Sequence, residues 1–125
     1  MHIFNDHTWT EERATTAVEF AIIAPVFIFL LVGILYVCLA LFAVGSLYYA
    51  VEEGARCASI ASSNCSSPDG IIAYTKSRYF GPSSSPIFTY NVAACGNSVK
   101  ASTNYVMDLA FKQFTIPINA SACFP

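Results

Sequence analysis

The feature that most constrains this chain is an uncharged, apolar run from Phe20 to Val51. Nearly every position in the run is Ala, Val, Ile, Leu, Phe, Tyr, Gly or Cys. A helix needs about 20 apolar residues to cross a hydrocarbon core roughly 30 Å thick. The run is longer than that by several turns, so it predicts a helix that crosses a bilayer once and continues beyond it.

A cleaved secretory signal is the main alternative to a retained span. Its apolar core would cover about 7–15 residues behind a basic flank. Here the core is far longer, and the flank sets Arg13 against three acidic residues. The sequence therefore favours a retained helix. The alternative is a secreted disulfide domain released by signal peptidase near Gly45 or Ala50.

The charges after the run do not suggest a nucleic-acid partner. Five basic residues stand among four acidic ones, and they form no basic stripe that could grip a phosphate backbone. Catalysis has equally little support. Glu52 and Glu53 are adjacent and would point about 100° apart on a helix, so they form no acid–base pair. No histidine follows the run, and there is no G-x-S-x-G turn. We expect no enzymatic activity and no small-molecule substrate.

Cysteines indicate the compartment of the residues after the run. Four of them lie there: Cys57, Cys65, Cys95 and Cys123. An even number in a small domain predicts two disulfides and an oxidising space, with three pairings possible. A zinc site is disfavoured because no C-x2–4-C pair exists and both histidines precede the run. We expect no metal and no cofactor, a short N-terminus inside, and a disulfide domain outside.

The long helix is predicted to begin near Thr15 or Thr16, where a threonine can cap free amides, and to continue to about residue 62. Small residues recur every four positions at Ala50, Gly54 and Ala58. Such a stripe allows another element to pack closely. We favour packing of the outer domain on its own helix over a helix–helix contact between subunits.

The remaining residues predict a small mixed domain. Ser67-Pro68 is typical of a helix start, and that helix would end at Gly81. Three segments with alternating polarity follow, joined first by a tight turn at residues 95–97: Ile87–Ala93, Val99–Leu109 and Phe114–Ala122. Pro117 places the last strand at a sheet edge or a bulge. The fold class is α+β, with a leader at 1–14, a transmembrane and extended helix at 15–62, and an α+β domain with a three-stranded antiparallel sheet at 63–125.

One charged residue stands out at the border of the apolar run. Glu19 is a carboxylate followed directly by Phe20 and an unbroken apolar segment. A charge at that position is costly and usually has a partner or a function. The other interpretation is a glutamate at the level of the lipid headgroups.

The stretch Arg13-Ala14-Thr15-Thr16-Ala17-Val18-Glu19-Phe20 resembles the processing region of type IV prepilins. With Glu53-Gly54-Ala55-Arg56 it is similar to TadE-like minor pilins (pseudopilins) of the tight-adherence, or Flp, pilus system. The resemblance covers about residues 13–62, and it implies a pilin-like fold.

The resemblance implies a cut between Ala14 and Thr15 by a prepilin peptidase. Glu19 would then be fifth and Phe20 sixth in the mature chain, and the freed amine could pair with Glu19 of a neighbouring subunit. Ala14 stands where the family usually has glycine, and the leader lacks the usual cluster of basic residues.

The resemblance also implies a place and a set of partners. The chain would sit in the bacterial inner membrane, with its N-terminus cytoplasmic and its disulfide domain periplasmic, and could enter an extracellular pilus. Its partners would be the membrane, the prepilin peptidase, the major pilin, sibling minor pilins and the assembly platform. The alternative is an uncleaved, membrane-anchored periplasmic binding domain.

Overall fold

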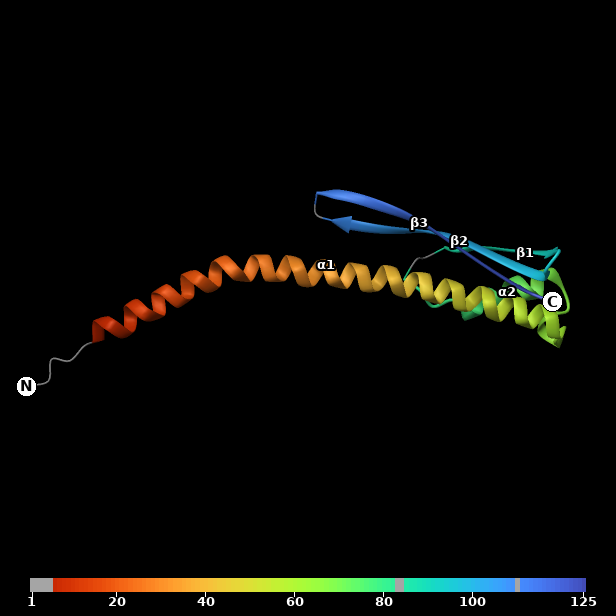
Figure 1. The fold of residues 1–125 in the computed structure, drawn as a ribbon, viewed down its shortest axis with the longest axis horizontal. Coiled ribbons are helices and arrows are strands. Elements are labelled where there is room, and N and C mark those ends of the chain that lie inside the picture. The colour runs from red at the N-terminus through yellow and green to blue at the C-terminus, as the bar shows by residue number, and fades with distance from the viewer. Residues whose placement is uncertain (1–5, 83–84, 110) are drawn as a thin grey trace, which may run out of the picture. The chain divides into compact units, whose positions relative to one another are not determined.

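The computed structural model describes residues 6–82, 85–109 and 111–125 (Figure 1). Its elements follow in this order: helix α1 (Asp6–Ile60), a 3-10 turn η1 (Ser63–Cys65), helix α2 (Pro68–Arg78), and strands β1 (Ile87–Ala93), β2 (Gly96–Leu109) and β3 (Lys112–Phe124). The chain divides into two compact units, Met1–Val37 and Cys38–Pro125. The predicted α+β class is confirmed, with one long apolar helix, one short helix and a three-stranded antiparallel sheet.

Helix α1 begins earlier than the sequence predicts. The expected start at Thr15 or Thr16 is wrong, because α1 already begins at Asp6, more than two turns before. Neither glycine nor proline occurs between Asp6 and Pro25, and acidic residues favour the first turns of a helix. Pro25 lies inside α1 without ending it.

The second unit is built on one face of the last turns of α1. Seven residues there are buried: Ala43, Ser46, Leu47, Ala50, Val51, Gly54 and Ala55. They recur at spacings of three and four, which places them on one side of the helix. Leu47 and Val51 are fully buried. This face of α1 is therefore part of the hydrophobic core of the second unit.

The sheet supplies the opposing side of that core. Its order is β1-β2-β3, and both pairs are antiparallel. Val99, Ala101 and Tyr105 of β2 are buried beside Ile118 and Ala120 of β3. Alternate residues face away, as expected for a sheet with one apolar face.

Two predictions about the sheet are confirmed, one for a turn and one for an edge strand. The turn before β2 joins β1 and β2 as a hairpin, and Gly96 has φ +115°, a conformation that side chains rarely adopt. Pro117 lies in the edge strand β3, where it pairs with Asn104. A missing amide donor is tolerated at an edge.

Helix α2 begins as predicted but ends early. Ser67 is its N-cap, and the Ser67 side chain accepts a hydrogen bond of 3.2 Å from the amide of Gly70. Pro68 occupies the first helical turn. The predicted end at Gly81 is wrong: the helix ends at Arg78, and Tyr79 already has extended backbone angles.

A glycine on α1 sets how closely α2 approaches. A Cβ built on Gly54 would collide with the side chain of Thr75, a fully buried residue of α2. The Thr75 hydroxyl donates to the carbonyl of Ile71 at 2.8 Å, which fixes its position. By contrast, a Cβ on Gly45 would meet nothing within 4 Å.

We predict that Gly54→Ala lowers the free energy of unfolding by about 1–2 kcal/mol, because overpacking outweighs the gain in helix propensity. Gly45→Ala is the matched control, and it should be neutral or stabilising by up to ~1 kcal/mol. Chemical denaturation of the full chain in detergent micelles measures both. Equal stability of the two variants would contradict the close contact with Thr75.

Candidate functional site

Helix α1 is the main functional candidate because a long described part of it is not covered by other elements of the chain. Its stretch Ala14–Ile60 is long and apolar enough to cross a membrane. Between Ala14 and Phe42 no described residue is buried. The core helix of a soluble protein would be covered along one face, as α1 is from Ala43 onward. The apolar run is thus divided. Residues 20–42, which we call the bare part, include no buried residue and touch the second unit only near their end, at Ala40 and Phe42, and residues 43–51 carry the packing face.

The bare part has the length that a bilayer requires. At about 1.5 Å per residue, residues 20–42 extend roughly 34 Å, close to the ~30 Å of a hydrocarbon core. The apolar run is longer than a bilayer span because its last turns, residues 43–51, pack inside the second unit.

The predicted processing and assembly residues lie together near the start of that span. Ala14, Thr15, Glu19 and Phe20 all belong to α1 and are exposed. Thr15 and Glu19 are four residues apart, so they share one face of the helix. A carboxylate at this position is available to a positive group, either in this chain or in another one.

The small-residue stripe is occupied within the chain. Ala50 and Gly54 are buried, Gly54 against Thr75 of α2, and Ala58 packs half-buried against the core. This part of the stripe has no room for a helix of a second subunit.

The two disulfides join neighbouring parts of the second unit. Cys57 at the end of α1 pairs with Cys65 of η1, with Cα atoms 5.8 Å apart. Cys95 of the β1–β2 turn pairs with Cys123 of β3, with Cα atoms 6.1 Å apart. The sequence left this pairing open. Cys38 is a free thiol and is exposed in the isolated chain.

An aromatic cluster lies where α1 enters the second unit. The ring of Phe80 is 6.0 Å from that of Phe42 and 5.8 Å from that of Tyr49. The Phe80 amide donates to the hydroxyl of Ser46 at 3.0 Å, which holds the segment after α2 on the helix. All three rings remain substantially exposed. The contribution of Phe80 depends on tertiary structure, and the sequence did not predict it.

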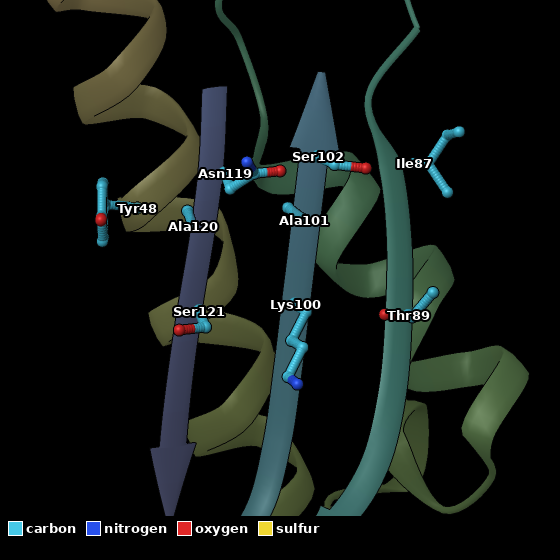
Figure 2. Close-up of a pocket in the computed structure, with 9 residues that line it drawn as sticks. All are labelled: Tyr48, Ile87, Thr89, Lys100, Ala101, Ser102, Asn119, Ala120 and Ser121. Atoms are coloured by element: carbon cyan, nitrogen blue, oxygen red, sulfur yellow. The ribbon is translucent and has the colours of Figure 1, made fainter. Parts of the chain in front are cut away.

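The outer face of the sheet forms an open, polar groove of about 470 Å³ (Figure 2). Its polar side chains come from all three strands: Thr89, Lys100, Ser102, Asn119 and Ser121. Tyr48 of α1 lies beyond the β3 side of the groove. Lys100 is the single charged residue in this lining, so the groove offers no acid–base pair. The described residues contain no cluster of potential metal ligands.

These features define a class of protein: one long apolar helix, able by length to cross a membrane, enters a small α+β domain that is closed by two disulfides. Residues 14–56 match the model of a family described as TadE-like protein. The chain is therefore TadE-like over its long helix, about a third of its length, and the resemblance seen in the sequence is confirmed. No curated protein and no solved structure matches the chain significantly.

The loops closed by the disulfides differ in length, 8 residues against 28. In the chain-entropy model, removal costs about 2.5 kcal/mol for the short loop and about 3.5 kcal/mol for the long one. We therefore predict that a Cys95→Ala/Cys123→Ala variant loses more unfolding free energy than a Cys57→Ala/Cys65→Ala variant, measured by chemical denaturation in micelles. Cys38→Ala serves as the control and should be unchanged. A larger loss of unfolding free energy for the Cys57→Ala/Cys65→Ala variant would show that loop closure in the denatured chain does not determine the effect of each disulfide.

Proposed function

We propose that this protein is a minor pilin or pseudopilin-like component of tight-adherence pilus assembly. The observation that carries the proposal is the bare apolar part of α1, which lies within the TadE-like match. Exposed apolar area of this extent is unfavourable in water and favourable in a bilayer or a bundle of helices. The protein would be anchored by α1 and would act through helix–helix contacts and contacts of its outer domain.

The disulfides support a periplasmic position for the second unit. Such bonds persist in oxidising compartments. The N-terminus would then lie in the cytoplasm and α1 would cross the bacterial inner membrane once. The expected partners are other pilus components, namely the major pilin, sibling minor pilins and the assembly platform, together with the prepilin peptidase.

Release by signal peptidase is less compatible with the packing. A cut near Gly45 would remove Ala43, and a cut near Ala50 would also remove Leu47. Both side chains are fully buried in the core of the second unit. Deleting a large buried side chain alone costs about 2–5 kcal/mol, which a small domain can hardly tolerate.

Assembly would depend on the charges at the head of the bare helix. A cut after Ala14 would leave an amine on Thr15, and a neighbouring subunit would offer the carboxylate of Glu19. In an apolar bundle each charge is costly alone, so their pairing would fix the stagger of the helices more than it would add stability. We propose this structural role and no catalytic one, since the polar groove offers no acid–base pair.

One prediction of this proposal concerns cleavage of the leader. Protein taken from membranes of cells that contain the prepilin peptidase should begin at Thr15, as read by intact mass and N-terminal sequencing. The Ala14→Gly variant should be processed at least as completely, because glycine is the residue the family usually has there. A chain that still begins at Met1 in both forms would favour the uncleaved, anchored periplasmic domain.

Another prediction of this proposal concerns Glu19. Glu19→Gln should abolish or strongly reduce piliation while the amount of protein in the membrane stays normal, because the amide cannot pair with a freed amine as a charge. Glu52→Gln is the matched control: the same exchange at an exposed position of the same helix, outside the bare segment. Normal piliation with Glu19→Gln would remove the pairing from the proposal.

A further inference from the structure

The strands β2 and β3 continue as a two-stranded arm beyond the end of β1. The first residue of β1, Ile87, pairs with Ser102, and the next pair of β2 and β3, Thr103 with Ile118, already lies past β1. The pairing of β2 with β3 continues to Leu109 and Lys112. We call residues 103–109 and 111–118 the arm.

Contacts within the second unit define the direction in which the arm points. At one end of β3, the carbonyl of Phe124 accepts a hydrogen bond of 3.3 Å from Ser59, near the end of α1. Further back along the strand, Ala120 lines the same groove as Tyr48. The strand β3 therefore runs parallel to α1, and its first residues lie toward the earlier turns of that helix. The arm points back toward the side on which α1 enters the unit, and Figure 1 shows the joined ends of β2 and β3 opposite the C-terminus.

The arm is long enough to reach the level of that entry. From Ala120 to Lys112 an extended strand covers about 26 Å. From Tyr48 back to Cys38, α1 covers only about 15 Å. Even a tilted strand thus brings the far end of the arm to the level of Cys38, where α1 enters the second unit.

The far end of the arm is apolar and carries a cation. Phe111 is 95% exposed. Phe114 and Ile116 on one face and Val106 on the other are exposed as well. The ammonium of Lys112 lies 5.4 Å from the centre of the Phe114 ring. Large exposed apolar side chains gathered in this way mark an interaction surface.

We propose that the end of the arm inserts into the surface of the membrane that α1 crosses; this inference rests on the anchoring proposed above. Phe111 and Phe114 would enter the upper acyl region, and the ammonium of Lys112 would remain at the anionic headgroups. The depth is limited in two ways. The arm has open strand edges, which are costly within hydrocarbon, and Asp108 carries a charge four residues before Lys112.

Lipid is favoured over a second copy of the chain by position. The aromatic cluster of Phe42, Tyr49 and Phe80 lies at the entry of α1, where an aromatic belt would meet the headgroups. The arm points to this same side. Two separate segments of the unit thus turn exposed aromatic side chains toward one surface.

Tryptophan fluorescence in brominated lipid tests the proposal on the full chain. Trp9 is the sole tryptophan, so Trp9→Phe gives a silent background for three single variants. Phe111→Trp reports on the arm, Phe29→Trp reports on the bare part of α1, and Val92→Trp is the control. Val92 is 74% exposed and pairs with Asn97, beside the turn at the opposite end of the sheet. Each variant is reconstituted in vesicles of phosphatidylcholine and phosphatidylglycerol, with and without bromine on the acyl chains.

We expect Phe111→Trp and Phe29→Trp to lose emission to bromine and Val92→Trp to keep it. Loss from Phe29→Trp with equal, weak loss from Phe111→Trp and Val92→Trp would overturn the insertion of the arm and leave the anchor intact. No loss from Phe29→Trp would overturn the anchor and the inference with it. Emission from Phe111→Trp that is insensitive to bromine but shifts with the ratio of protein to lipid would show that a second copy covers the arm, and would also overturn the proposal.

Discussion

The structure depends on the burial of one face of α1 between Ala43 and Ala55. The sheet has a single apolar face, built around Val99, Ala101 and Ile118, and a three-stranded sheet of this size cannot bury that face alone. The last turns of α1 complete the core, and Leu47 and Val51 are fully buried there. The domain is therefore not an independent globule attached to a helix, because the helix is one of its layers.

This arrangement gives α1 two environments along one uninterrupted apolar run. From Phe20 to Phe42 the helix is apolar all round, which suits lipid or a bundle of helices. From Ala43 it is apolar on the side that packs, and the polar Ser46 on that side accepts a hydrogen bond from the amide of Phe80. A buried hydroxyl is acceptable there only because it has this partner. The change at Phe42 separates the two environments, although the composition of the run shows no boundary.

Local patterns in the sequence were sufficient for most elements and insufficient for their contacts. Alternating polarity located β1 at its observed bounds, and Ser67-Pro68 located the start of α2. The start of α1 differs from the predicted threonine cap because no glycine or proline interrupts the helix between Asp6 and that threonine. The pairing of Cys95 with Cys123 could not be read at all. It follows from the strand register, which places Ser98 opposite Cys123 and Ala93 opposite Gly96. The contact of Gly54 with Thr75 and the arm beyond β1 are likewise products of tertiary structure.

The limits of the family match have a physical meaning in this fold. The match begins at Ala14 and ends at Arg56, one residue before the first disulfide cysteine. It therefore includes both the bare apolar segment and the whole packing face up to Ala55, but none of the sheet that covers that face. In this chain the helix therefore sets two requirements for the domain that covers it: an apolar layer that fits the packing face, and a small residue, Gly54, where α2 approaches. Because the family match contains the whole uncovered apolar segment and none of the strands that form the polar groove, the helix and the carboxylate of Glu19 at its head are the first features to test for function.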